Sequence, residues 1–221
     1  MKEVQDFFFR KAKEEGYRAR SAYKLIEIDD RRKLLRKGDR VLDLGAAPGS
    51  WTQVAAARVG EHGLVVGVDL KAIDPRGLPK WVTLMKADLR DLDASTFGGT
   101  YFDAVISDMA PDTSGDPFGD SVRSCHLCQA LLDRLPNWLR RGGHSTMKVF
   151  EGAEYPELLR RTERLFEDSK GFKPRSSRAE SVEMFIVCKG YKGHDAEPAP
   201  ESRPARRRGW GDEPDDVDRS A

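Results

Sequence analysis

The sequence has little that suits an exported or membrane-spanning protein. Only three of its 221 residues are cysteines, a small and odd number that fits a reducing compartment better than a disulfide framework. Its uninterrupted apolar runs are a few residues long, whereas a bilayer span needs roughly 20 residues. Phe7–Phe9 is too short for a signal-peptide core. We therefore expect a cytoplasmic protein without membrane association.

The sequence also lacks a large net charge, but the charges are unevenly distributed. The 38 Lys and Arg residues nearly balance the 37 Asp and Glu residues, for a formal net charge of +1. Residues 1–40 contain 13 basic and 8 acidic residues, whereas residues 194–221 contain 5 basic and 8 acidic residues. The near-neutral total therefore does not exclude a nucleic-acid contact through the basic segment 1–40.

The chain is expected to form one domain over residues 1–193, which is long enough to bury its own core. Within it, residues 1–40 are expected to be a basic, helical segment. Residues 194–221 are rich in Pro, Arg and Asp, with Trp210 as their one large apolar residue besides Val217. Such a composition buries too little surface to offset the entropy of ordering, so we expect a disordered tail.

Short β-branched runs alternate with longer helical patterns along this domain. Helices are expected at about 20–36, 50–59, 121–140 and 155–169, and strands at Val41–Leu44, Leu64–Leu70, Val82–Met85, Phe102–Ser107, His144–Phe150 and Val182–Cys188. This alternation predicts an α/β fold with a mostly parallel sheet and helices on both faces. The connection from Phe172–Pro174 to the last strand is too short for a helix, so the last strand should run antiparallel.

In such sheets, ligands bind beyond the carboxyl ends of the strands. The first strand runs into the turn Gly45–Gly49, whose glycines let the backbone approach a ligand closely, and Ser50 can cap the following helix. A turn needed only for tight packing is the alternative. The spacing of the glycines does not match G-x-G-x-x-G, which disfavours a nicotinamide-dependent oxidoreductase.

Three aspartates end the next strands in order: Asp69, Asp88 and Asp108. Each alone is commonly a cap or turn residue. Together, beside a glycine-rich turn, they favour an adenosine-containing ligand. In that interpretation the Asp69 carboxylate accepts hydrogen bonds from the ribose hydroxyls, and the Asp88 carboxylate accepts one from the exocyclic amine of the adenine.

Charged residues also interrupt apolar strands. Lys148 lies in Ser145–Phe150, Glu183 lies in Val182–Val187, and Lys24 lies on the expected helix 20–36. An unpaired charge in a central strand costs several kcal/mol, so each residue either faces solvent or finds a partner. If Lys24, Asp108, Lys148 and Glu183 converge, their charges balance.

On these residues the chain resembles the FtsJ/RrmJ-type ribosomal RNA 2′-O-methyltransferases. The matching stretches are Arg18–Leu25, Asp43–Trp51, Ser107–Pro111, Met147–Phe150 and Ser176–Val187. Together they cover nearly all of residues 1–193 in order. One departure is Ser50, where the family often has a second glycine.

The resemblance implies a Rossmann-like, S-adenosylmethionine-dependent methyltransferase fold with a seven-stranded sheet. It implies methylation of the ribose 2′-hydroxyl of a uridine in 23S rRNA of the large (50S) ribosomal subunit. The implied catalytic tetrad is Lys24, Asp108, Lys148 and Glu183, with Lys148 as the proton acceptor. The cofactor contacts expected are Gly45, Gly49, Trp51, Asp69, Asp88 and Asp108.

The RNA contacts expected are Arg18, Arg20, Lys24 and Arg32. We expect a monomer without a metal, because a sulfonium methyl group is already activated. Three alternatives stay open: 2′-O-methylation of tRNA or another RNA, a non-catalytic RNA-binding module in ribosome assembly, and the oxidoreductase already disfavoured.

Cys125 and Cys128 form a C-x-x-C, which is found in zinc sites and in thioredoxin-like redox sites. They share a helical stripe with Leu132, Leu135 and Leu139, and Cys188 is the only further thiol. The pattern therefore favours buried core thiols.

Overall fold

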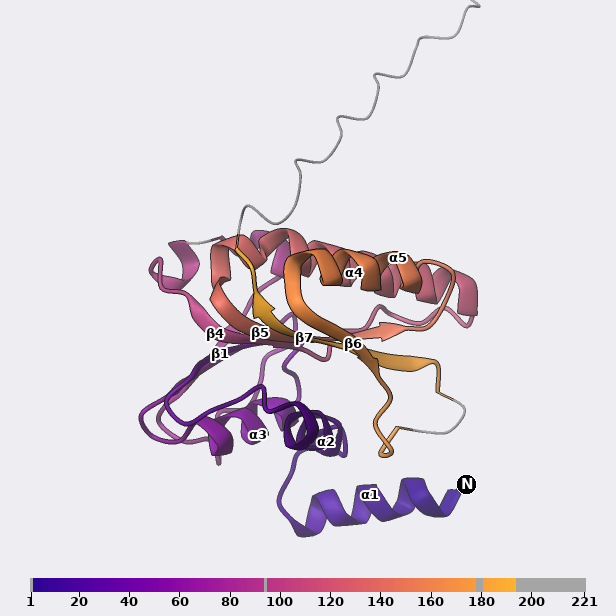
Figure 1. Ribbon diagram of the computed structural model, residues 1–221. Helices are drawn as coiled ribbons and strands as arrows, with labels where there is room; N and C mark the ends of the chain where they lie inside the picture. The colour runs from indigo at the N-terminus through magenta and orange to yellow at the C-terminus, as the bar shows by residue number, and fades with distance from the viewer. Residues whose placement is uncertain (1, 94, 178–180, 194–221) are drawn as a thin grey trace, which may run out of the picture.

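A computed structural model of the chain describes residues 2–93, 95–177 and 181–193 (Figure 1). The expected tail, residues 194–221, lies outside the described residues.

The fold is built on a seven-stranded sheet with the strand order β3-β2-β1-β4-β5-β7-β6. The strands are β1 Arg40–Leu44, β2 Leu64–Asp69, β3 Val82–Lys86, β4 Phe102–Ser107, β5 Leu139–Phe150, β6 Phe166–Phe172 and β7 Glu183–Tyr191. Neighbouring strands from β3 to β5 are parallel, whereas β7 is antiparallel to both β5 and β6. The predicted mostly parallel sheet with an antiparallel last strand is confirmed.

Helices cover both faces of this sheet. They are α1 Lys2–Glu14, α2 Ala22–Arg32, α3 Ser50–Val59, α4 Pro117–Trp138 and α5 Tyr155–Leu165, with short 3₁₀ turns at Leu89–Asp91 and Ser95–Phe97. α2 and α3 lie on one face and α4 and α5 on the other, while α1 lies beyond α2, away from the sheet (Figure 1). Two clusters of buried apolar side chains fill the two layers.

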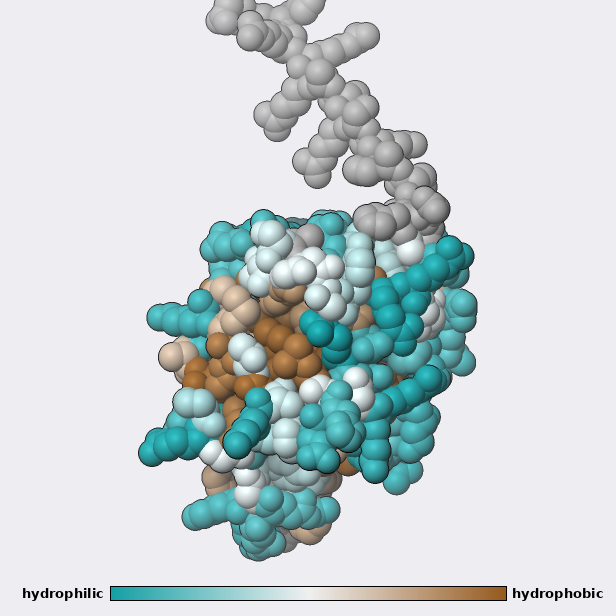
Figure 2. All heavy atoms as spheres, turned by 90° about the vertical axis from the view of Figure 1, so that its left-hand side faces the viewer, coloured by the Kyte–Doolittle hydropathy of each residue, from teal (hydrophilic) through white to brown (hydrophobic). Residues whose placement is uncertain are grey.

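β3 forms one edge of the sheet, and its side chains are only partly buried. A hollow of about 390 Å³ lies there, lined by Ile73, Leu78, Val82 and Leu84 among others. Figure 2 shows a face of the molecule on which apolar side chains gather in a hollow surrounded by hydrophilic ones.

The expected helix 155–169 is wrong in its last turn, because α5 ends at Leu165. Phe166–Phe172 forms β6 instead, and every described pairing of β6 is with β7. Phe166 is buried against Tyr191, with ring centroids 5.4 Å apart. This long-range pairing overrides a local pattern that could also form a helix.

Three other boundaries differ from the expected ones by four residues or more. α4 begins earlier, at Pro117, because the Asp116 side chain accepts hydrogen bonds from the N–H groups of Phe118 and Gly119. β5 begins at Leu139, five residues before the expected strand His144–Phe150. α2 ends at Arg32 rather than at 36.

Asp29 explains why α2 ends where it does. Its buried Oδ1 accepts hydrogen bonds from the N–H groups of Leu34 and Leu35, both at 2.9 Å. Its Oδ2 lies 3.1 Å from Arg58 Nε on α3. One carboxylate therefore satisfies two backbone donors after the helix and ties α2 to α3.

We predict that Asp29→Ala lowers the free energy of unfolding by about 2–4 kcal/mol, because it leaves two buried N–H groups without an acceptor. Urea unfolding measures this. The matched control is Asp30→Ala, which removes an exposed carboxylate paired with the same Arg58 and should cost less than about 1 kcal/mol. Equal losses in the two variants would contradict this role of Asp29.

Candidate active site

The loops after three neighbouring strands begin side by side. Leu44, the last residue of β1, is in register with Val68 of β2 and with Ser107, the last residue of β4. The expected ligand turn therefore lies between Asp69 on one side and Asp108 on the other.

Lys148 forms the first of two ion pairs at this edge. Its Nζ donates to Asp108 Oδ1 at 2.8 Å and to the Asp108 backbone oxygen at 2.6 Å. Only 8% of the Lys148 side chain and 18% of the Asp108 side chain are exposed. The charge in the middle of an apolar strand is therefore paired rather than directed to solvent.

Lys24 and Glu183 form the second ion pair, with Nζ and Oε2 2.6 Å apart. Burial acts to raise the pKa of Glu183, but the ammonium groups of Lys24 and Lys148 outweigh it and lower the pKa below its ordinary value. The Glu183 backbone N–H also donates to Ser181 Oγ. Glu183 is therefore a carboxylate at neutral pH.

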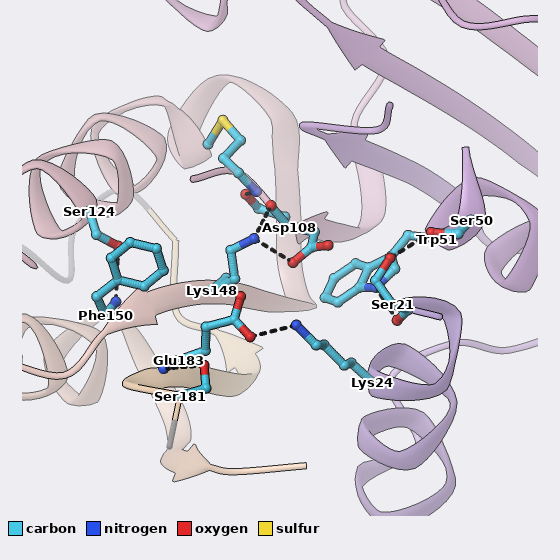
Figure 3. A network of polar contacts seen from close by, with 12 residues as sticks. Ser21, Lys24, Ser50, Trp51, Asp108, Ser124, Lys148, Phe150, Ser181 and Glu183 are labelled. Atoms are coloured by element: carbon cyan, nitrogen blue, oxygen red, sulfur yellow. Dashed lines mark hydrogen bonds and ion pairs between the residues drawn. The ribbon is translucent and has the colours of Figure 1, made fainter. Parts of the chain in front are cut away.

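The two pairs face each other across one small region (Figure 3). Asp108 and Lys148 come from the ends of β4 and β5, Glu183 opens β7, and Lys24 reaches in from α2. The sequence left the convergence of these four residues as a condition and the family resemblance implied it, but neither predicted which lysine pairs with which carboxylate.

A hollow of about 540 Å³ opens beside the tetrad. Arg20, Lys24 and Glu183 line it together with the apolar side chains of Phe150 and Val182. Its lining thus combines two basic side chains, the carboxylates of Glu183 and Asp120, and an apolar wall. Basic and apolar groups of this kind can contact the phosphate and the base of a nucleotide.

The turn after β1 is held by backbone geometry and by Asp69. Gly45 has a φ of +72°, and a Cβ there would lie 2.6 Å from Met109 Cγ. Asp69 Oδ2 accepts from the Ala47 N–H at 2.9 Å, and its Oδ1 accepts from the Lys71 N–H. Asp69 therefore holds the turn through the Ala47 N–H, and the absence of a side chain at Gly45 lets Met109, in the loop after β4, pack against the turn.

Trp51 and Asp88 are placed differently from a simple ligand contact. The Trp51 indole is buried, stacks on Phe185 and donates to the Ser21 backbone oxygen. The indole itself is therefore not open to a ligand. Asp88 lies beyond β3 as expected, and the side-chain hydrogen bonds from Arg90 lower its pKa to about 2.

These residues fit the adenosine-containing ligand that the strand ends favour and the sulfonium that the family resemblance implies. Carboxylates follow the strands on both sides of β1, where they can accept from hydroxyls and face a positive charge. Between them, the turn packs closely against Met109 at Gly45 and against Arg18 at Gly49, which leaves no room for a side chain at either position.

Asp43 is a buried charge that the sequence reasoning did not single out. It lies in β1, is 0% exposed, and accepts from Thr52 Oγ1 at 2.6 Å. Burial raises its pKa to about 7, the carboxylates of Asp108 and Asp69 add to the rise, and the Thr52 hydrogen bond opposes it. The signal was available, since Asp43 interrupts the apolar strand Val41–Leu44.

The expected RNA contacts fall into two groups. Arg20 and Lys24 line the hollow beside the tetrad. The Arg18 guanidinium instead donates to backbone oxygens of Pro48 and Arg76, and Arg32 forms an ion pair with Asp168 on β6. The structure thus brings two of the four residues to the hollow.

The cysteines are core residues, as the helical stripe predicts. Cys125, Cys128 and Cys188 are free thiols and all buried, and burial raises the pKa of each. Cys128 Sγ donates to the Lys148 backbone oxygen at 3.1 Å, which ties α4 to β5 behind the site. No group of potential metal ligands occurs among the described residues.

Comparison with known proteins points to a single family. The family model for FtsJ-like methyltransferases matches residues 17–191. Within the described part of the chain, no helix is long and apolar enough to cross a bilayer.

Similar proteins cover most of the chain. "Ribosomal RNA large subunit methyltransferase E" of Syntrophobacter fumaroxidans is 48% identical over 83% of this chain and 94% of its own length. The protein of the same name from Brachyspira hyodysenteriae is 39% identical over 87% and 98%, respectively. A crystal structure assigned as a ribosomal RNA methyltransferase of Plasmodium falciparum aligns with a TM-score of 0.69 and 27% identity, and covers 80% of this chain and all of that one.

Asp43 gives a pH-dependent prediction. Because its folded-state pKa is about 7 and the unfolded value is about 3.9, the folded state holds this proton more tightly. Wild-type stability should therefore fall, relative to Asp43→Asn, by on the order of 4 kcal/mol as the pH rises from about 4 to above 7.

Urea unfolding of both proteins across this pH range measures the difference. Asp91→Asn, at an exposed position, is the control. A wild-type minus Asp43→Asn difference that is constant from pH 4 to 8 would contradict the prediction.

Proposed function

The chain belongs to the FtsJ-like methyltransferase family, and on that premise we propose that it transfers a methyl group from S-adenosylmethionine to RNA. The acceptor is the ribose 2′-hydroxyl of a uridine in 23S rRNA of the large ribosomal subunit. Relatives named as large-subunit ribosomal RNA methyltransferases support this choice of substrate.

The observation that carries the proposal is the pair of ion pairs beside the hollow. Lys24 and Glu183 line the hollow in which a ribose could bind, and the pair of Lys148 with Asp108 faces them. Their charges cancel, so the group can be held in a largely buried site.

S-adenosylmethionine, when bound, supplies an activated methyl group on a positive sulfur. In this proposal the Asp69 carboxylate would accept from the ribose of its adenosine and the Asp108 carboxylate would balance its charge. Asp88 would accept from the base only after exchanging its side-chain hydrogen bonds with Arg90. The residues of this chain must then orient the attacking hydroxyl and remove its proton.

Lys148 is the proton acceptor in this proposal. In the resting site Lys148 is an ammonium paired with Asp108, so it first releases one proton to solvent. In the resulting neutral amine, the two hydrogen bonds to Asp108 use both N–H groups and leave the lone pair for the 2′-hydroxyl proton. As the oxygen–carbon bond forms and the carbon–sulfur bond breaks, that proton moves to Nζ, and the new ammonium remains paired with Asp108.

Lys24 orients the acceptor. Its Nζ gives one N–H to Glu183, and the others are available to the 2′-oxygen and the adjoining phosphate. Glu183, whose pKa is lowered, keeps Lys24 charged and in place. Arg20, on the wall of the same hollow, adds a phosphate contact, and the requirement for a 2′-hydroxyl selects RNA over DNA.

We predict that Lys148→Ala abolishes methyl transfer and leaves cofactor binding largely intact, because Lys148 acts on the acceptor rather than on the cofactor. Transfer from labelled S-adenosylmethionine and a binding isotherm measure the two effects. Lys37→Ala, at an exposed position, is the control. Near wild-type turnover of Lys148→Ala would rule out the assigned role.

The substrate is tested by offering 50S particles, free ribosomal RNA and tRNA in parallel, followed by mapping of the methylated nucleotide. We expect a 2′-O-methyluridine in 23S rRNA, because the relatives carry that substrate class in their names. Methylation confined to tRNA would replace this substrate, and no transfer to any RNA would contradict the proposed activity.

A further inference from the structure

We propose that Arg18 is a positioning residue of the cofactor site, which braces the turn Gly45–Gly49, and that it is not a contact for RNA. The inference rests on the proposed use of this turn to bind S-adenosylmethionine. It assigns a different role to a basic residue that sequence alone places among the RNA contacts.

The Arg18 guanidinium joins two loops at the ligand edge of the sheet. Its Nη1 donates to the Pro48 backbone oxygen at 3.0 Å, and its Nη2 donates to the Arg76 backbone oxygen at 2.5 Å. Pro48 lies in the turn after β1, and Arg76 lies in the connection from β2 to β3. Because the guanidinium is planar and its N–H groups are held in a fixed arrangement, its two hydrogen bonds constrain the positions of the two loops relative to each other.

Gly49 provides the second observation. Its φ is +107°, and a Cβ at this position would lie 2.7 Å from Arg18 Nη1 and 3.3 Å from Ile73 Cγ2. The absence of a side chain at Gly49 therefore makes room for the guanidinium as well as for the backbone conformation. A side chain at position 49 would therefore displace the Arg18 guanidinium.

The backbone around Arg18 is tied to the start of α3. The Arg18 N–H donates to Gln53 Oε1 at 2.9 Å, and Gln53 Nε2 donates to the Gly16 oxygen at 3.0 Å. A hydrogen bond joins Ser21 Oγ and Ser50 Oγ at 2.8 Å. These contacts fix the backbone of residues 16–21 against α3, and the guanidinium can turn outward toward RNA only by giving up its bonds to Pro48 and Arg76.

This bracing also links the two halves of the reaction. Lys24 lies in the first turn of α2, three residues after the N-cap Ser21, and its side chain lines the hollow proposed for the acceptor. The segment that positions Lys24 is thus the segment that holds the cofactor turn. Loss of the brace should weaken cofactor binding first, because the turn is its direct contact.

The test compares Arg18→Ala, Arg18→Lys and Arg36→Ala. Arg36 is an exposed residue of the same basic segment, so its substitution removes the same charge without touching the turn. Calorimetric titration with S-adenosylhomocysteine gives the cofactor-site dissociation constant, and RNA binding without cofactor is measured as a function of salt.

We expect Arg18→Ala to raise the dissociation constant about tenfold or more, because the charge-assisted hydrogen bonds to Pro48 in the turn and to Arg76 in the β2–β3 connection are both lost. Arg18→Lys should recover part of the loss, since an ammonium can reach one carbonyl but not both. RNA affinity and its salt dependence should change no more than in Arg36→Ala.

The opposite pattern would overturn the proposal: unchanged affinity for S-adenosylhomocysteine in Arg18→Ala, with weaker RNA binding and a shallower salt dependence than in Arg36→Ala. Wild-type affinity for S-adenosylhomocysteine in Arg18→Lys would also contradict the proposal, because it would show that the two simultaneous hydrogen bonds of a guanidinium are not required. A wild-type protein that binds no S-adenosylhomocysteine would instead refute the proposed function, so the two failures are distinguishable.

Discussion

The ion pair between Lys148 and Asp108 is the interaction on which the rest of the site depends. Both groups are largely buried at the end of neighbouring strands, where either charge alone would be strongly unfavourable. The parallel register of β4 and β5 brings them together, with Ser107 in register with Met147. The sheet topology therefore supplies the contact, and the contact in turn fixes the direction of the Lys148 amine.

The same reasoning extends outward from this pair. Glu183 and Lys24 add a second, mutually neutralising pair from β7 and α2, so the site contains four charges without a net excess. The antiparallel course of β7 is what brings Glu183 to this edge, because in a parallel strand its first residue would lie at the opposite edge. The antiparallel direction of β7 thus supplies Glu183, the fourth member of the tetrad.

Much of this could be predicted from sequence, because the informative residues break local patterns. Lys148 and Glu183 stand out as charges in apolar strands, and Asp69, Asp88 and Asp108 follow the ends of strands that the β-branched runs mark. β6 could not be recognised in the same way, since Phe166–Phe172 becomes a strand through pairing with β7. The partners of Arg18 were also beyond reach, because Pro48 and Arg76 are distant in sequence and accept through backbone oxygens.

The central claim is that the Lys148 amine accepts a proton, rather than only supplying positive charge. Lys148→Arg tests this most directly, because a guanidinium can keep the ion pair with Asp108 but does not release its proton near neutral pH. Single-turnover methyl transfer to the ribosomal substrate, with cofactor binding measured alongside, should show intact binding and a rate reduced by about a hundredfold or more. A Lys148→Arg rate within about threefold of wild type, instead of the expected loss, would contradict the account. Lys148 would then have an electrostatic role alone.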